Sequence, residues 1–313
     1  MKGLELSERF FLTHGAPMLR SEFPHLEGLL AVGLAGSGSE CFGFDDGISH
    51  DHDFEPGFCI FLPDEDLIDS RTEFALERAY AKLPREFMGY RRQPLSPVGG
   101  NRHGVIRMSD FFRDKTGTCD GSLTLRDWFF IPEQSLAEAT NGKVFCDELG
   151  KFSAIRQALA YLPEDVRLKK LAGELLLMGQ AGQYNYPRCI SRGDTAAAQL
   201  SMAEFVSHAL HAIFLLNRRY LPYYKWSFRA LRELPCLASL EGKLEFLISS
   251  ANTPDEVLQK KDFTEQICAS VTDRLRAQKL TAFAGDAMEG HAHEVNDRIR
   301  DADLRNLHIL YGV

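Results

Sequence analysis

Residues 152–313 consist of successive segments whose apolar side chains recur every three or four positions. The pattern is clearest at Leu168, Leu171, Leu175 and Met178. This spacing puts apolar side chains along one face of a helix, and Pro163 stands where such a helix would begin. Further segments with helical patterns cover residues 196–221, 239–250, 253–280 and 293–310. This half of the chain is therefore expected to be all-helical.

The first half of the chain is richer in glycine and proline and contains short apolar runs typical of strands. These runs are Leu29–Gly36, His50–Pro63, His103–Met108 and Gly142–Asp147. One helical pattern, over 68–82, lies among them. We therefore expect an α+β fold, in which a domain with a small mixed β-sheet (1–150) precedes an all-helical domain (151–313).

Composition excludes several classes of protein. The formal net charge of −8 argues against a nucleic acid as partner, because nucleic-acid binders usually carry a basic surplus. No apolar run approaches the roughly 20 residues that span a bilayer, so no membrane association is expected. The seven cysteines are scattered without a C-x-x-C pair, which favours free thiols in a cytoplasmic protein over a disulfide framework.

The motif that indicates chemistry is Gly38-Ser39 followed further along by Asp51-x-Asp53. A Gly-Ser turn lets backbone N–H groups approach a triphosphate without obstruction by a side chain. Two carboxylates with one residue between them on a strand project to the same face, where they can hold Mg²⁺ beside the phosphates. The order and spacing predict a site of phosphoryl transfer.

The segment GSECFGFDDGISHDHDF resembles the polymerase-β-like nucleotidyltransferase superfamily, and in particular a bacterial branch that carries a domain of unknown function. This branch is distantly similar to the antibiotic adenylyltransferases. Three later segments extend the resemblance over nearly the whole chain, namely Tyr161–Ala172, Gly182–Asp194 and Leu215–Trp226. The resemblance implies a mixed α/β catalytic domain and a helical domain that closes over the nucleotide and acceptor.

By this resemblance, Gly38 and Ser39 would contact the triphosphate of the nucleotide, while Asp51 and Asp53 would bind Mg²⁺. The superfamily often supplies a third carboxylate from a neighbouring strand. Asp147, at the end of the strand GKVFCD, is the first choice for it, and Glu55 is the second. The strand HGVIRM contains no acid at all.

Three basic residues of the helical half are expected to contribute to nucleotide binding. Lys225 follows a proline break between two helices and could reach the β- and γ-phosphates, or could be a solvated lysine on a loop. Arg188 and Arg192 could line the cleft for the nucleotide or acceptor, or could cap the helix that ends nearby.

Other polar residues admit alternative roles. His50 and His52 alternate with the aspartates and could form a mixed site for zinc or iron. Asp45 and Asp46 are expected to shape the loop through hydrogen bonds to the backbone.

Glu204, His208 and His211 could form a metal-binding face, although a helix with histidines at its polar edge is commoner. His291 and His293 are expected in a loop.

The sequence thus predicts an enzyme that transfers a nucleoside monophosphate, most simply AMP, from a Mg²⁺-bound nucleoside triphosphate to an acceptor hydroxyl. The acceptor would be a small molecule or a protein. The first alternative is a catalytically weak nucleotide-binding regulatory protein of the same fold. The second is a hydrolase that uses the His/Asp cluster with a transition metal.

Overall fold

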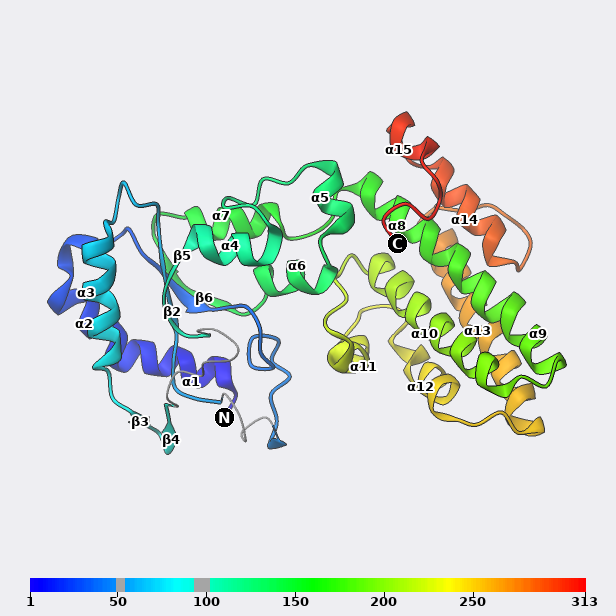
Figure 1. The fold of residues 1–313 in the computed structure, drawn as a ribbon, viewed down its shortest axis with the longest axis horizontal. Helices are drawn as coiled ribbons and strands as arrows, with labels where there is room; N and C mark the ends of the chain where they lie inside the picture. The colour runs from blue at the N-terminus through cyan, green and yellow to red at the C-terminus, as the bar shows by residue number, and fades with distance from the viewer. Residues whose placement is uncertain (49–53, 93–101) are drawn as a thin grey trace. The chain divides into compact units, whose positions relative to one another are not determined.

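The structure, a computed structural model, describes residues 1–48, 54–92 and 102–313 (Figure 1). The chain divides into two compact units. The first unit comprises Met1–Leu123 and Gln134–Ala160, and the second comprises Thr124–Glu133 and Tyr161–Val313. The chain therefore enters the second unit briefly before it completes the first.

Among the described residues, a four-stranded mixed sheet with the order β5-β2-β1-β6 organises the first unit. Strand β1 (Ala31–Leu34) lies in the middle, antiparallel to both β2 (Cys59–Leu62) and β6 (Lys143–Asp147). Strand β5 (Gly104–Arg107) is parallel to β2. The short strands β3 (Glu86–Phe87) and β4 (Tyr90–Arg91) form a separate hairpin.

The sequences of β1 and β2 are continuously apolar because helices cover both faces of the sheet. On one face, Ile60 and Leu62 join a core cluster with Phe10. On the other face, the ring of Phe61 stacks on that of Phe152, with the ring centroids 4.0 Å apart. Figure 1 shows α2 and α3 on one side of the sheet and α4 and α7 on the other.

The helices of the first unit are short. They are α1 (Gly3–Phe10), α2 (Ala16–Glu22), α3 (Ser70–Ala81), α4 (Met108–Thr116), α6 (Glu133–Thr140) and α7 (Lys151–Ala158). Helices α1 and α2 are joined by a π-helical turn. The first residue of α6, Glu133, belongs to the second unit.

The second unit, all of whose residues are described, contains helices and no strand, and the chain as a whole is mixed α and β as predicted. Its helices are α5 (Leu125–Phe130), α8 (Glu164–Met178), α9 (Tyr186–Ser191), α10 (Thr195–Leu216), α11 (Tyr224–Arg232), α12 (Glu241–Ser249), α13 (Pro254–Ala277), α14 (Met288–Asp297) and α15 (Ala302–Asn306).

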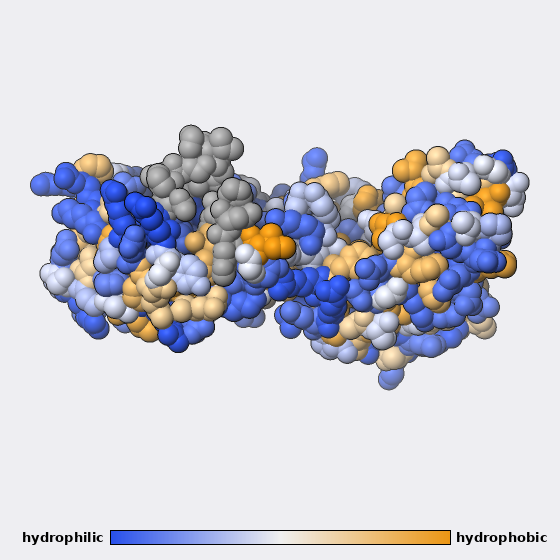
Figure 2. All heavy atoms as spheres, turned by 90° about the horizontal axis from the view of Figure 1, so that it is seen from below, coloured by the Kyte–Doolittle hydropathy of each residue, from blue (hydrophilic) through white to orange (hydrophobic). Residues whose placement is uncertain are grey.

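Helix α10 forms the core of the second unit. It packs against α8, α9, α12 and α13. By length and composition it is also apolar enough to cross a membrane, with a mean hydropathy of 1.2 over an 18-residue window, of which 56% is buried inside the protein. A buried core helix passes the same test. On the face of the molecule shown in Figure 2, hydrophobic residues are interspersed with hydrophilic ones in both units.

Candidate functional site

Three strand ends meet at one edge of the sheet. In the antiparallel pair of β1 and β2, Gly33 near the end of β1 lies opposite Cys59, the first residue of β2. In the parallel pair of β2 and β5, Cys59 lies opposite Gly104, the first residue of β5. The chain segments that leave β1 and enter β2 and β5 therefore converge at this edge, and the Gly-Ser motif is the segment that leaves β1.

Asp51 and Asp53 lie outside the described residues, as do His50 and His52. The predicted strand over 50–63 is described only from Phe54, and its regular part is limited to β2. The segment that follows Asp53 in the chain therefore leads into β2 at the same sheet edge at which the chain leaves β1.

The Gly-Ser loop, defined here as residues 35–44, is held by the turn between α6 and β6. The backbone N–H of Gly36 donates to Asn141 Oδ1 (2.9 Å), and Asn141 Nδ2 donates to the carbonyl of Gly36 (2.8 Å). The N–H of Gly142 donates to the carbonyl of Cys41 (2.9 Å). Gly38 has a backbone φ of 123°, a value that residues other than glycine rarely adopt. The loop is thus fixed in a conformation that needs glycine.

Lys115 pairs with the carboxylates of Asp114 and Glu138 beside this loop. Its Nζ donates to Glu138 Oε2 (2.8 Å) and to Ser37 Oγ (3.3 Å), and Glu138 also accepts from the Ser37 hydroxyl. Burial lowers the pKa of Lys115, but hydrogen bonds to Glu138 and Asp114 outweigh it and leave the pKa raised. The lysine therefore stays charged beside the Gly-Ser loop. It stands far from the motif in sequence, so the motif did not reveal it.

Glu40 is a buried acid in the same loop. Its side chain is 7% exposed, and its Oε1 has no hydrogen-bond partner among the residues that the structure describes. The carboxyl packs so closely on Gly38 that a Cβ there would lie 2.4 Å from Oε1. Burial raises the pKa of Glu40, while its own backbone N–H, His103 and Arg102 act in the opposite direction. Glu40 is thus a buried carboxyl whose surroundings disfavour its charged form.

Glu55, the second choice for the third carboxylate, is paired with a histidine. Its Oε1 lies 3.1 Å from Nδ1 of His103, the residue that precedes β5. The histidine ring is 8% exposed, and Gly57 makes room for it, because a Cβ there would lie 2.7 Å from the ring. A Glu–His pair thus lies at the sheet edge where β5 begins. No pattern in the sequence singles out His103.

The structure does not bring Asp147, the first choice, to this edge. Asp147 pairs with Ala31 at the beginning of β1, whereas the Gly-Ser loop follows Leu34 at its end. Three residues along a strand correspond to about 10 Å. The Asp147 carboxylate instead accepts the N–H groups of Gly150 (3.0 Å) and Ser153 (2.7 Å) at the start of α7. These bonds fix the turn that leads from β6 into α7.

Asp45 and Asp46 bond to the backbone as expected. Asp45 Oδ2 accepts the N–H of Gly3 (2.9 Å), the first residue of α1. Asp46 Oδ1 accepts the N–H of Ile48 (3.0 Å), two residues further along the chain. Both side chains therefore fix the path of the chain between the Gly-Ser loop and the aspartate pair.

The three basic residues predicted for nucleotide binding lie in the second unit, at opposite ends of α10. Arg188 belongs to α9 and donates to the Tyr184 hydroxyl (2.7 Å), and Arg192 is the exposed residue at the end of α9. Lys225 lies in the first turn of α11, 4.8 Å from the ring of Trp226. Figure 1 shows α9 and α11 at the two ends of the 22-residue α10, which is about 33 Å long. The structure does not bring these residues together.

The histidines of α10 meet acids that the sequence did not connect with them. His208 Nδ1 lies 2.7 Å from Glu174 Oε2, and His211 Nδ1 lies 3.9 Å from both Glu174 and Glu133. Burial lowers the pKa of His211, but the two carboxylates outweigh it and leave the pKa raised. Across the described parts of the chain, no three His, Cys, Asp or Glu side chains are arranged to hold a metal ion. Both histidines are half-buried, and these contacts join them to the buried carboxylates of Glu174 and Glu133.

Comparison with known families gives a match over part of the chain. The model of a family described as a domain of unknown function (DUF4037) matches residues 128–227. This segment runs from α5 into α11 and includes all of α8 and α10. No curated protein and no solved structure matches the chain.

Proposed function

We propose that the chain is a Mg²⁺-dependent nucleotidyltransferase, which moves a nucleoside monophosphate from a nucleoside triphosphate to an acceptor hydroxyl. The observation that supports it most is the convergence, at one sheet edge, of the Gly-Ser loop, the segment after Asp51-x-Asp53 and the Glu55–His103 pair. Phosphoryl transfer needs a phosphate cradle, a metal site and a proton acceptor close together.

The residue types of the aspartate motif and of the Gly-Ser loop fit Mg²⁺. In the sequence, Asp51 and Asp53 offer carboxylate oxygens, the ligands that Mg²⁺ prefers, and in the Gly-Ser loop Glu40 Oε1 is buried without a partner in the described chain. When bound, the metal would neutralise charge on the transferred phosphoryl group. The backbone N–H groups of Gly38 and Ser39 would face the phosphates, and Lys115 would add its charge.

The Glu55–His103 pair would receive the proton of the acceptor. The acceptor oxygen attacks the α-phosphorus, a new P–O bond forms, and the bond to the β-phosphate oxygen breaks to release pyrophosphate. His103 would take the hydroxyl proton while Glu55 holds the ring in place through Nδ1. Asp147 has no part in this scheme, because its carboxylate binds the backbone N–H groups of Gly150 and Ser153.

The test is pyrophosphate release from each of the four nucleoside triphosphates with Mg²⁺, with cell extract supplied as acceptor. The native chain should release pyrophosphate, most simply from ATP, and Asp51→Asn/Asp53→Asn should reduce the rate at least about a hundredfold. Asp66→Asn, an exposed aspartate in the same unit, is the control. Equal rates in the double variant and the native chain would refute the proposal.

The absence of an acid on β5, all of whose residues are described, favours a second candidate function. The fold could bind a nucleotide and regulate another process with little turnover. In that case a fluorescent ATP analogue would bind the native chain in the presence of Mg²⁺, while no nucleoside triphosphate would release pyrophosphate. Loss of this binding in Asp51→Asn/Asp53→Asn would assign the same site to the regulatory function.

A further inference from the structure

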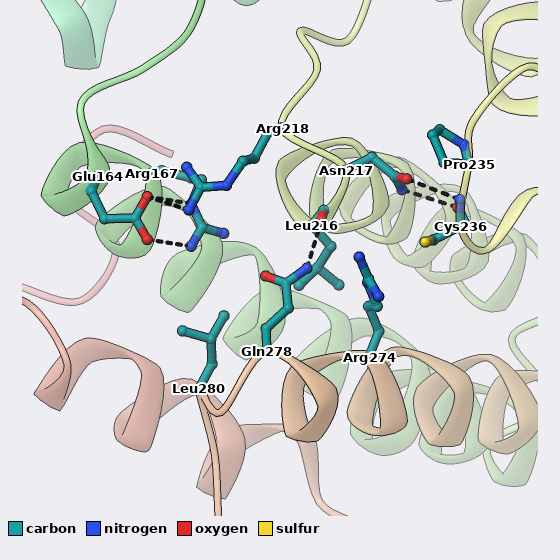
Figure 3. Close-up of a pocket in the computed structure, with 10 residues that line it drawn as sticks. All are labelled: Glu164, Arg167, Leu216, Asn217, Arg218, Pro235, Cys236, Arg274, Gln278 and Leu280. Carbon is teal, nitrogen blue, oxygen red and sulfur yellow. Dashed lines mark hydrogen bonds and ion pairs between the residues drawn. The ribbon is translucent and has the colours of Figure 1, made fainter.

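The helical unit contains a cavity of about 440 Å³ at the C-terminal ends of α10 and α13 (Figure 3). Its polar lining consists mainly of Arg167, Arg218, Arg274, Glu164, Gln278 and Cys236. Apolar side chains complete the wall. Cavities of this size hold small organic molecules in other proteins.

The charges around the cavity do not balance. Three guanidinium groups face one carboxylate, that of Glu164. This carboxylate is shared, because Arg167 Nη2 donates to its Oε1 (2.6 Å) while Arg218 Nη2 lies 2.7 Å from its Oε2. Two positive charges are therefore left without a neutralising partner in the lining.

Arg274 is the arginine that the protein itself does not use. Its Nε is buried and has no hydrogen-bond partner among the residues that the structure describes. The neighbouring Asp273 is paired with Arg276 instead (3.7 Å). In Figure 3 the side chain of Arg274 points from α13 into the cavity and carries no dashed line. A buried donor without an acceptor costs free energy unless a ligand or water supplies one.

The end of α10 does not explain Arg274. Basic side chains often bind the free carbonyl groups at a helix C-terminus. Here, however, each of the last four carbonyls of α10 already accepts a hydrogen bond. The donors are Asn217 to Ile213 and Phe214, Arg218 and Arg167 to Leu215, and Gln278 to Leu216.

We propose that this cavity binds a small phosphate monoester, with Arg274 on the phosphate group and the Arg167–Arg218–Glu164 cluster, which keeps one positive charge, in the same lining. Such a phosphate carries nearly two negative charges at neutral pH, which matches the two positive charges left over in the lining. Leu216, Pro235 and Leu280 would contact the less polar part of the ligand. The site belongs to the helical unit alone and does not depend on the proposed nucleotidyl transfer.

The probe is phenyl phosphate, which combines the phosphate with an apolar body. Binding is measured by titration calorimetry in EDTA on the Asp51→Asn/Asp53→Asn background, so that the proposed nucleotide site does not contribute. Protection of Cys236 from iodoacetamide, followed by peptide mass spectrometry, locates the ligand, because this thiol lines the cavity. Phenyl phosphate should bind and slow the alkylation of Cys236.

Arg274→Met keeps most of the apolar stem and removes the charge. It should weaken binding at least about tenfold and abolish the protection of Cys236. Lys261→Met, which changes an exposed lysine on the same helix, should leave both unchanged. If circular dichroism shows that Arg274→Met is unfolded, Arg274→Gln takes its place.

Three outcomes would overturn the assignment. The first is that phenyl phosphate, at millimolar concentration and in excess over protein, does not bind the parent chain. The second is unchanged binding in the Arg274 variant. The third concerns the charge of the ligand. Benzoate, which has a single negative charge, should bind at least about tenfold more weakly than phenyl phosphate. Equal affinities would contradict the match to a doubly charged group.

Discussion

The carboxyl group of Glu40 is buried where water cannot stabilise its charge, and this burial raises its pKa. An acid whose pKa is higher in the folded state binds more protons there than in the unfolded state. Its contribution to stability is present below the unfolded pKa and is lost as the pH rises through the folded pKa. Glu40 should therefore reduce the stability of the metal-free protein near neutral pH.

Glu40→Gln removes this titration while it keeps the size of the side chain. The variant should be more stable than the native chain at pH 7, and the gain should shrink as the pH falls toward 4.5, the ordinary pKa of a glutamate. Urea unfolding at pH 7 and pH 5, in EDTA, measures the difference. Glu22→Gln, at an exposed position, should show no such trend. A native chain that is the more stable of the two at pH 7 would contradict this account.

At the residue scale, the sequence predicted roles that depend on neighbours in the chain better than roles that depend on distant partners. Asp45 and Asp46 bond to the backbone as expected, because the short side chain of an aspartate reaches nearby N–H groups. The partners of Ser37 are Lys115 on α4 and Glu138 on α6, which lie 78 and 101 positions away in the chain. No spacing rule within one segment could reveal them. The roles of Asp51 and Asp53 stay predictions.

Among the elements, the apolar strands and long helices were predictable and the short polar helices were not. The runs GKVFCD and HGVIRM contain β6 and β5, and α13 begins at Pro254 after Thr253, as its capping signal predicted. Helices α4 and α7 were missed because each has only two or three turns. The histidines expected in a loop lie in α14, where His291 is buried and bonds to Thr281.

The turn between α6 and β6 fixes the Gly-Ser loop, and Gly142 is its tightest point. Its φ is 70°, and a Cβ there would lie 1.9 Å from the carbonyl oxygen of Leu34. Gly142→Ala should lower the free energy of unfolding by about 3 kcal/mol or more. Gly150→Ala is the matched control, since Gly150 has a φ of 73° and nothing within 4 Å of a Cβ.

The Gly150→Ala control separates the cost of the clash with Leu34 from the cost of a positive φ at alanine. Gly150→Ala should cost only the strain of a left-handed alanine, about 1 kcal/mol. Urea unfolding of the two variants measures both costs. Equal costs would mean that the carbonyl of Leu34 moves aside freely, and the turn would then not hold the loop. The Gly142 variant should also impair pyrophosphate release more than the control does.

At the scale of the whole molecule, the sequence suggested one boundary near residue 150, whereas the chain passes between the two units three times. Thr124–Glu133 belongs to the second unit, and the first unit ends at Ala160. Hydrophobic periodicity describes one segment at a time. It therefore could not show that the short helix α5 packs with α8, across the intervening α6, β6 and α7.

The two units have separate cores, so a core mutation should change the unfolding of its own unit alone. Leu62 and Leu275 are both fully buried, the first in the sheet unit and the second in the helical unit. Each Leu→Ala change should cost about 2–5 kcal/mol in its own unit. Differential scanning calorimetry should show two transitions, with each variant shifting only one of them. A single transition that both variants shift equally would mean that the units unfold together.

The clamp of Asn141 on Gly36 also has a consequence for the time course of synthesis. The two residues are 105 positions apart in the chain. At roughly 5–20 residues per second, a ribosome needs on the order of 5–20 s to reach the second residue after the first. During this interval β1 has no β6 beside it and the Gly-Ser loop has no anchor. The edge of β1 that pairs with β6 therefore stays unpaired in the nascent chain until residues 141–147 have been synthesised.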